Sequence, residues 1–372
     1  MKLKKKPLFA SGLSALLCLF FAALFAIGEA VAMGLTEDLD SLNAGKRWSA
    51  AGEPYATIAL HTDAASALTR NEVEHYAMSI DTGLLNASIA SPENGSAWTY
   101  GYFAETTLAV TGPKATAQIS TIAAGGSFFT FHPLEFVYGA PFTYDRTLPD
   151  GVVLDEDAAW RIFGAVDVVG MTLETGGRDL TVTGIVRKER NTEGYEKAYG
   201  DLPRMYMSYY GYEAITGEMS NITTYEVTLP NPVKSFAMNI FETAVRINED
   251  SMTVRENSAR YTFSSRFQRM KEMPYLGMRT DRIIYPYFEN ELQVTDYRTA
   301  LWMQYQVAAA VLSLLCLLTA VICLFAGGFS VTGLLKSAFG NLQRKWEEHK
   351  RNSPSRKSRK KKTEHKNVTT DI

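Results

Sequence analysis

Two long apolar runs dominate how this chain can fold. They extend from Leu8 to Ala32 and from Val307 to Phe329, and each is long enough for a helix that crosses ~30 Å of hydrocarbon, which takes ~20 apolar residues. The second run contains no charged residue and follows Trp302 and Tyr305, aromatic residues that suit the headgroup boundary. The sequence therefore predicts two membrane helices that enclose one large segment.

The first run also has features of a secretory signal. Lysines precede it, and Ala30-Val31-Ala32 forms an A-x-A cleavage pattern. Its apolar stretch is longer than the ~7–15 residues usual in a signal sequence. We favour a retained membrane anchor, with cleavage of the run as the alternative.

Basic residues flank the outer ends of both runs, as lysines before Pro7 and as a Lys- and Arg-rich stretch from Arg344 to Lys362. The positive-inside rule then predicts that both termini are cytoplasmic and that Gly34 to Ala300 is extracytoplasmic. That segment carries 22 Lys+Arg against 35 Asp+Glu, a net charge of −13. The residues after Ser330 carry 12 against 4, a net charge of +8.

This charge division indicates which partners to expect. Phosphate binding needs a basic face, so an acidic exterior argues against nucleic acid. The basic tail is expected either to contact anionic membrane lipids or to be a disordered segment that only fixes topology. The three cysteines, Cys18, Cys316 and Cys323, lie within the apolar runs, so the exterior must be stabilised by a hydrophobic core rather than by disulfides or cysteine-bound zinc.

Local patterns in the exterior segment alternate between strand and helix. Alternation predicts a strand over 55–60, and Thr69 with Glu72 predicts a capping box at the start of a helix that Gly83 ends. Further strands are predicted over 98–110, 115–122, 172–174, 180–186 and 222–229, with a hairpin turn at Gly176-Gly177. A helix is predicted directly after Asn231-Pro232. The predicted class is α+β, or mixed α/β.

Asp155, Glu156 and Asp157 form the most conspicuous cluster of carboxylates. Asp155 follows the apolar residues 152–154 and is placed to cap a helix over 156–163 that Gly164 ends, while the next two acids favour the helix dipole. A metal site would need more ligands, and no calcium-loop pattern is present. We therefore interpret all three carboxylates as structural.

Other checks for chemistry give no catalytic, cofactor-binding or metal-binding residue. The exterior histidines His61, His75 and His132 are widely spaced and lack an H-E-x-x-H pattern, and no G-x-S-x-G motif occurs. Gly328 and Gly333 have P-loop spacing, but Leu334 stands where the lysine is required. The Met- and Tyr-rich stretch 205–210 could line a ligand pocket, although such residues more often fill a core. We expect a protein that is not an enzyme and needs no cofactor.

Residues 127–186 contain SFFTFHPLEFVYGAPF and GVVLDEDAAWRIFGAVDVVGMTLETGGRDLTVTGIV. In order and spacing they resemble the extracytoplasmic core domain of MacB-type ABC transporter permeases. The matching features are Gly139 with Phe142, Phe163-Gly164 with Asp167 and Gly170, and the hairpin end Val182-Thr183-Gly184-Ile185. Val168 stands where the family often has proline. Family permeases usually have three membrane helices after this domain and this sequence has one, so the resemblance implies other permease subunits as partners.

Residues around the second apolar run suggest a mechanical role. Tyr287 to Ala326 is free of proline and glycine, and as one helix its 40 residues would extend ~60 Å, twice the hydrocarbon thickness. The excess could form a stalk, or a separate short helix could precede the span. After Gly327-Gly328, an apolar stripe from Val331 to Trp346 predicts an interfacial cytoplasmic helix.

Two features of the membrane helices are also interpreted from the sequence. Small residues predict a close helix–helix contact, namely Ser11, Ala15, Ala22 and Ala26 on one helix and Ala309, Ser313 and Ala320 on the other. Glu29, near the outer end of the first run, is expected to lie in the interface, with pairing to another subunit as the alternative.

These observations predict four segments: 1–33, cytoplasmic N-terminus and first membrane helix; 34–286, extracytoplasmic MacB-like domain; 287–329, stalk and second membrane helix; 330–372, cytoplasmic amphipathic helix and basic tail. The expected function is that of a cell-membrane subunit of an ABC-type transporter or mechanotransmission complex. It would couple the exterior domain to a separate ABC ATPase and work as an oligomer or hetero-complex. The alternative is a membrane-anchored binding or scaffold protein without ATP coupling.

Overall fold

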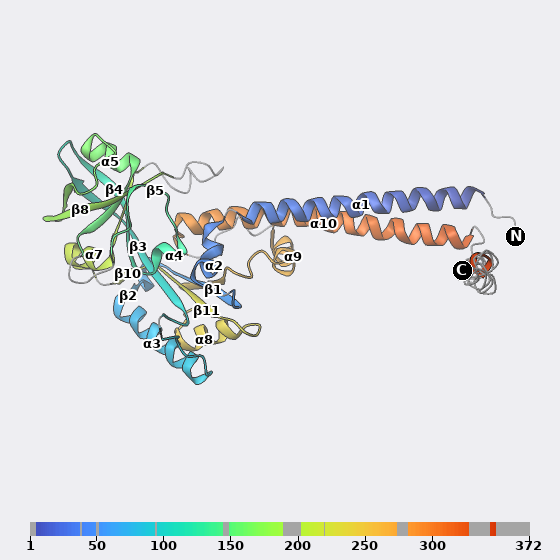
Figure 1. Ribbon diagram of the computed structural model, residues 1–372, viewed down its shortest axis with the longest axis horizontal. Coiled ribbons are helices and arrows are strands. Elements are labelled where there is room, and N and C mark those ends of the chain that lie inside the picture. The colour runs from blue at the N-terminus through green and yellow to red at the C-terminus, as the bar shows by residue number, and fades with distance from the viewer. Residues whose placement is uncertain are drawn as a thin grey trace, which may run out of the picture. The chain divides into compact units, whose positions relative to one another are not determined.

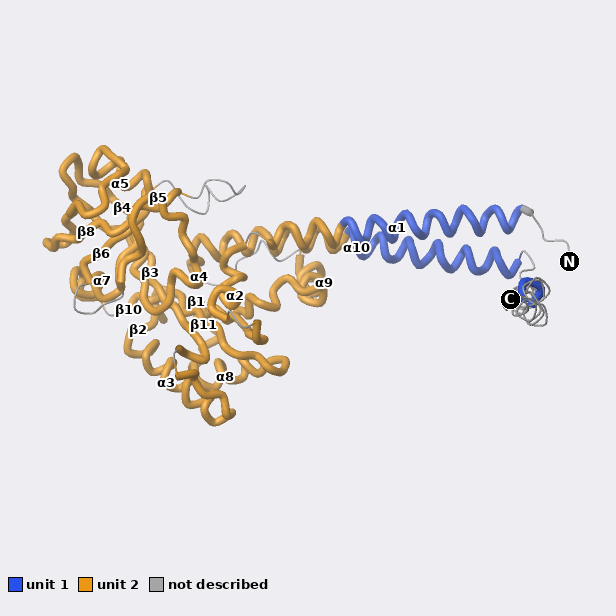
Figure 2. The backbone as a smooth tube through the Cα atoms, viewed as in Figure 1, with its two compact units in different colours: residues 1–27, 305–372 blue, residues 28–304 orange. Residues whose placement is uncertain are grey.

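The computed structural model describes residues 5–37, 39–49, 52–93, 95–143, 149–188, 202–218, 220–273, 282–326 and 343–346. The chain divides into two compact units, residues 1–27 with 305–372 and residues 28–304 (Figure 2). Two helices are long and apolar enough to cross a membrane, α1 (Lys5–Glu37) and α10 (Tyr287–Ala326). They flank a domain of mixed strands and helices in the sequence, as predicted. Most of the predicted cytoplasmic helix lies outside the described residues.

A ten-stranded, mostly antiparallel sheet forms the framework of residues 28–304 (Figure 1). Its strands follow the order β12 (Met252–Glu256), β1 (Tyr55–Thr62), β11 (Thr224–Pro230), β3 (Thr99–Thr111), β4 (Thr116–Gly126), β9 (Arg204–Ser208), β6 (Gly151–Asp155), β8 (Arg178–Val186) and β5 (Phe136–Gly139). The β4–β9 and β6–β8 pairs are parallel, and β7 (Thr172–Thr175) pairs with β3 and β8. A separate small sheet joins β2 (Leu68–Thr69) to β10 (Ser220–Ile222). Every strand segment predicted from the sequence is therefore confirmed within a few residues.

Short helices connect and cover these strands. In chain order they are η1 (Asp40–Asn43), α2 (Ala44–Trp48), η2 (Ala64–Ser66), α3 (Arg70–Asn86), α4 (Phe128–Phe131), α5 (Glu156–Phe163), α7 (Tyr209–Thr216), α8 (Phe236–Ala244) and α9 (Phe263–Glu272). Helices α3 and α8 lie together near β1 and β11, whereas α5 lies near β6 and β8 (Figure 1). The predicted capping box is present, because the Thr69 side chain accepts from the Glu72 backbone and the Glu72 side chain accepts from the Thr69 backbone.

Two predicted helix boundaries are wrong. Helix α3 continues past Gly83 to Asn86, because this glycine serves close packing: a Cβ there would lie 3.3 Å from the side chain of Ile240 in α8. Helix α8 begins four residues after Pro232 instead of directly after it, because Ser235 has a left-handed backbone with φ of 66°.

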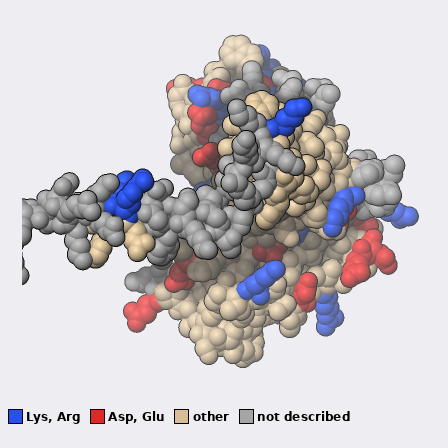
Figure 3. Space-filling view, turned by 90° about the vertical axis from the view of Figure 1, so that its right-hand side faces the viewer, with Lys and Arg blue, Asp and Glu red and all other residues tan. Residues whose placement is uncertain are grey.

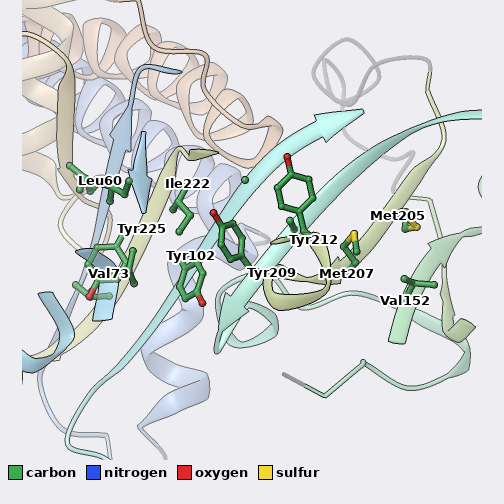
Figure 4. Packing of buried hydrophobic residues seen from close by; sticks show 14 of the residues in the cluster. Leu60, Val73, Tyr102, Val152, Met205, Met207, Tyr209, Tyr212, Ile222 and Tyr225 are labelled. Atoms are coloured by element: carbon green, nitrogen blue, oxygen red, sulfur yellow. The ribbon is translucent and has the colours of Figure 1, made fainter. Parts of the chain in front are cut away.

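Alternate residues of the strands fill two hydrophobic clusters, one on each face of the large sheet. The larger cluster contains Tyr102, Val152, Met205 and Met207 (Figure 4) together with buried residues of α3, α5, α7 and α8. Their sequence neighbours belong to the second cluster, which includes Phe103, Val153 and Tyr206 together with Tyr287 and Phe288 of α10. This period of two is the expected signature of a sheet that is covered on both faces. In the Met- and Tyr-rich stretch 205–210, Met205, Tyr206, Met207 and Tyr209 are buried core residues, as the more frequent role of such residues suggested, whereas Tyr210 is half-buried.

The unit formed by residues 1–27 and 305–372 contains parts of α1 and α10 that run side by side (Figure 1). The Ser14 hydroxyl donates to the Cys316 carbonyl at 2.8 Å, and Cys18 Sγ lies 3.3 Å from Ser313 Oγ. The small residues Ser11, Ala309 and Ala320 are buried, as predicted. The prediction for Ala15, Ala22 and Ala26 is wrong, since all three are exposed. Hydroxyl and thiol groups need partners in an apolar medium, and they determine the contacting face of α1.

Candidate functional site

The first three turns of α10, residues 287–296, are held in the exterior domain and are called here the α10 root. Tyr287 and Phe288 are buried in the second hydrophobic cluster. Phe288 stacks on His132, with ring centroids 3.7 Å apart, and the guanidinium of Arg204 lies 4.1 Å from the ring centroid of Tyr287. The long helix therefore starts from packed aromatic side chains and not from a loose linker.

Arg260 is the centre of the polar contacts that hold the α10 root. It lies in the loop between β12 and α9 and is 2% exposed. Its Nη1 and Nη2 donate to Glu289 at 2.7 and 2.8 Å, and its Nε and Nη2 donate to Asp296 at 3.1 and 2.6 Å. Nη1 also donates to Asn257 Oδ1 at 3.1 Å. The guanidinium is thus bound by both carboxylates, a geometry that suits its fixed fork of donors.

Three arginines surround the two carboxylates of this group. Glu289 and Asp296 are seven residues apart, which places them on the same side of α10. Arg269 also donates to Asp296, and Arg255 Nε lies 3.6 Å from Glu289. Burial disfavours a charged guanidinium, but Glu289 and Asp296 raise the pKa of Arg260 well above its ordinary value. We call these five side chains the Arg260 network; it links the α10 root to the chain on both sides of the β12–α9 loop.

Two histidines lie beside this network. His132 Nε2 is 2.5 Å from Glu226 Oε2, and His61 Nδ1 is 3.2 Å from Thr224 Oγ1. His61 Nε2 lies 3.9 Å from Glu289 and has no hydrogen-bond partner among the described residues. Both histidines line one small cavity, with room for about one water molecule. Burial lowers the pKa of His61, outweighing the opposite effects of Glu289 and Glu226.

The three histidines of this domain are widely spaced in the sequence, and the fold brings two of them together. His61 and His132 are buried, whereas His75 is exposed on α3. Neither buried ring joins a cluster suited to a metal: within the described ranges, no group of three His, Cys, Asp or Glu residues could hold a metal ion. His132 stacks on Phe288, and His61 packs edge-to-face on Tyr285, just before α10.

Two of the three carboxylates at residues 155–157 make structural contacts of the kind that the sequence predicts. Asp155 is fully buried; its Oδ1 accepts from the Ala158 amide at 2.6 Å and its Oδ2 from the Arg204 amide at 2.9 Å. Asp157 pairs with Lys188 at 2.8 Å. Gly164 ends α5 with φ of 80°, a left-handed backbone that favours glycine. Asp155 caps α5 and also ties it to β9.

The burial of Asp155 predicts a pH dependence of stability. Burial raises its pKa to about 6, although its two backbone hydrogen bonds favour the ionised form. Since the unfolded value is ~3.9, its contribution to stability is fully present below that pH and is lost as pH rises through the folded value. Relative to an Asp155→Asn variant, the wild-type free energy of unfolding should fall on the order of 2 kcal/mol between pH 4 and pH 7. Thermal unfolding of both full-length proteins across this range measures the difference, and a constant difference would contradict the burial argument.

The sequence analysis missed the Arg260 network. The only local signal was the spacing of Glu289 and Asp296 on one side of a predicted stalk. Arg260 lies 29 and 36 residues before them, so only the fold brings these three residues together. On the face drawn in Figure 3, exposed acidic and basic side chains are scattered among uncharged ones.

Comparison with known proteins concerns mainly the exterior domain. Residues 18–252, more than half of the chain, match the family described as the MacB-like periplasmic core domain. The extracellular domain of the noncanonic ABC-type transporter YknZ from Gram-positive bacteria is 14% identical with a TM-score of 0.37, covering 54% of this chain and all of that one. The periplasmic region of MacB from Actinobacillus actinomycetemcomitans gives 14% and 0.37, covering 55% of this chain and 89% of that one. None of the curated proteins matches this chain.

The Arg260 network lies outside the matched residues, whereas its neighbours His61, His132 and Arg204 lie within them. The matched residues end at 252, before the Arg260 network, α9 and α10. The match confirms the resemblance seen in residues 127–186 and extends it over most of the exterior domain. The ion pairs of the Arg260 network are therefore observed in this structure and are not supplied by the comparison.

Proposed function

Because the chain belongs to the family with a MacB-like periplasmic core domain, we propose that it is a non-enzymatic membrane subunit of an ABC-type transporter or mechanotransmission complex. In this proposal, a separate chain supplies the ATPase, and further permease subunits complete the membrane assembly. The exterior domain contacts an external partner or substrate, and α10 carries conformational change between the two sides of the membrane.

The attachment of α10 is the observation that carries this proposal. The α10 root is bound by the Arg260 network and by aromatic packing, so a displacement of this segment must move the surrounding strands or break buried ion pairs. The same helix continues without interruption to Ala326. A continuous helix that is fixed at one end is a suitable element for transmitting a shift or a tilt.

The proposed topology places both termini in the cytoplasm and residues 34–286 outside, with 287–329 as stalk and second span and 330–372 as the cytoplasmic end. The charge division supports it, because basic residues flank the outer ends of both apolar runs. A tag at either terminus should resist a protease that is added to intact spheroplasts, while the exterior domain should be cleaved. Cleavage of a terminal tag under conditions that preserve a cytoplasmic marker would refute the topology.

Association with an ATPase is the most informative biochemical test. We expect affinity purification of the full-length chain in a mild detergent to recover an ABC ATPase and at least one further permease subunit, identified by mass spectrometry. The matched control is the same chain without residues 330–372, the cytoplasmic end nearest to such a partner, which should recover less ATPase. Recovery of the chain alone, under conditions that keep a known transporter intact, would favour the scaffold alternative.

The neighbouring coding sequence provides a rapid comparison between the two functions. An adjacent gene for an ABC ATPase and one for a fuller permease would support the transport proposal. A membrane-anchored scaffold needs neither of them.

A further inference from the structure

We propose that α9 is an interfacial helix that binds the phospholipid headgroup layer on the outer side of the membrane. The inference goes beyond the coupling function, but it rests on the proposed crossing of the membrane by α1 and α10. It assigns a lipid-binding role to the segment Phe263–Glu272, which lies outside the matched residues 18–252.

The first observation is an ion pair between the buried Arg266 and the partly exposed Glu29, which joins α9 to α1. Arg266 Nη2 donates to Glu29 Oε1 at 2.5 Å, and the Arg266 side chain is 3% exposed. Glu29 lies three residues before Ala32, the end of the first apolar run, which is ~4.5 Å inside that end along a helix. A carboxylate at this depth needs an ionic partner. The structure supplies such a partner within the chain, because Arg266 binds Glu29.

The second observation is a contact at the other membrane helix. The amide of Gln304 donates to Met273 Sδ at 3.0 Å, and Met273 directly follows α9. Gln304 lies three residues before Val307, where the second apolar run begins. Near its start, α9 therefore binds a residue of α1 just inside the end of the first apolar run. Just after its end, the chain contacts a residue of α10 just outside the start of the second apolar run. Both contacts place α9 at the level where hydrocarbon meets headgroups.

The third observation is that α9 has three different sides. One side binds the protein: the Arg269 side chain donates to Asp296, and the Ser265 hydroxyl donates to the Ala259 carbonyl at 2.8 Å. A second side is apolar and incompletely covered, and it consists of Phe263, which is 49% exposed, Phe267 and Met270. The third side is polar and exposed, and it consists of Ser264, Gln268 and Glu272.

Lys271 lies between the apolar and the polar sides. Its Nζ is 4.7 Å from the ring centroid of Phe267. A flexible lysine beside an aromatic ring can extend its ammonium to the phosphate level while the ring enters the apolar boundary. Arg266 and Arg269 are committed to ion pairs inside the protein. We therefore infer that phenylalanine insertion and one lysine–phosphate contact bind the bilayer, and that a zwitterionic phospholipid is sufficient.

Spin-label accessibility of the full-length chain in phosphatidylcholine nanodiscs tests this assignment. After replacement of the three native cysteines by serine, single labels are placed by Phe263→Cys, Phe267→Cys, Ser264→Cys and Gln268→Cys. Labels at 263 and 267 should collide several-fold more with oxygen than with a water-soluble nickel complex. Labels at 264 and 268, each one residue further along, should show the reverse preference. The latter two positions are exposed, so their labels disturb no packing.

Two reference labels separate failure of this inference from failure of the membrane crossing. Leu315→Cys lies on an exposed face of α10 within the apolar run, and Asp179→Cys lies on an exposed position of β8. If the label at 315 collides mainly with the nickel complex, the membrane crossing fails and the inference fails with it. If the label at 315 prefers oxygen while those at 263 and 267 behave like the label at 179, only the lipid-binding role of α9 is refuted.

Discussion

Replacement of Arg260 by methionine is expected to lower the free energy of unfolding of the exterior domain by about 3–5 kcal/mol, because one charge would be removed from a buried group that holds two carboxylates. Glu289 and Asp296 are 2% and 4% exposed. Glu289 would lose both hydrogen bonds from Arg260 and keep only Arg255, whose Nε is 3.6 Å away, whereas Asp296 would keep its ion pair with Arg269. Unpaired buried carboxylates are among the most destabilising groups that a substitution can leave behind.

The midpoint of thermal unfolding measures this loss in the full-length protein. A loss of this size in a domain of 150–250 residues corresponds to a decrease in Tm on the order of 10 °C. Arg187→Met is the matched control, because Arg187 and Glu135 form an exposed pair whose side chains are 57% and 63% accessible. Exposed pairs contribute ~0–1 kcal/mol. Equal shifts for the two variants would show that the Arg260 network does not hold the α10 root.

A compensating variant tests whether Arg260 stabilises this site through its charge or through the volume of its side chain. Combining Arg260→Met with Glu289→Gln removes the carboxylate that lost its close partner and leaves the Arg269–Asp296 pair in place, so it should recover part of the lost stability. No recovery would mean that the guanidinium acts mainly by filling space between the β12–α9 loop and α10.

Insertion of a proline between the α10 root and the apolar run is expected to uncouple the exterior domain while leaving it folded. Gln304→Pro removes a backbone donor in the interior of α10 and places its ring against the carbonyl four residues earlier, at a cost of ~3 kcal/mol or more and with a kink. Gln304 is exposed and lies after the α10 root, so the Arg260 network should remain intact. The control Gln304→Ala also removes the contact with Met273 but preserves the helix.

Local signals were sufficient where sequence neighbours determine the structure. The capping box of Thr69 and Glu72, the cap at Asp155 and the left-handed stop at Gly164 each depend on residues within one or two turns. The alternation of apolar residues likewise predicted the strands, because one side chain in two faces each hydrophobic cluster. The absence of proline and glycine from Tyr287 to Ala326 allowed either one continuous helix or two helices, and the structure has the continuous one.

Tertiary contacts decided the features that local patterns could not predict. From the sequence alone Gly83 predicts the end of a helix, and only its packing against Ile240 of α8 shows its different role. Glu29 and Arg266 are 237 residues apart, so their pairing has no local signal. The contacting face of α1 could not be chosen by residue size alone, because hydrogen bonds of Ser14 and Cys18 to α10 select it.

The central claim is that the nucleotide state of a cytoplasmic ATPase reaches the exterior domain through α10. Hydrogen–deuterium exchange of the co-purified complex in nanodiscs, with and without a trapped ATP analogue, tests it most directly. The account predicts that trapping changes exchange in peptides from residues 34–304 of the wild type and of Gln304→Ala, but not of Gln304→Pro. Unchanged exchange throughout these residues in the wild type, while the ATPase itself shows protection by nucleotide, would contradict the claim.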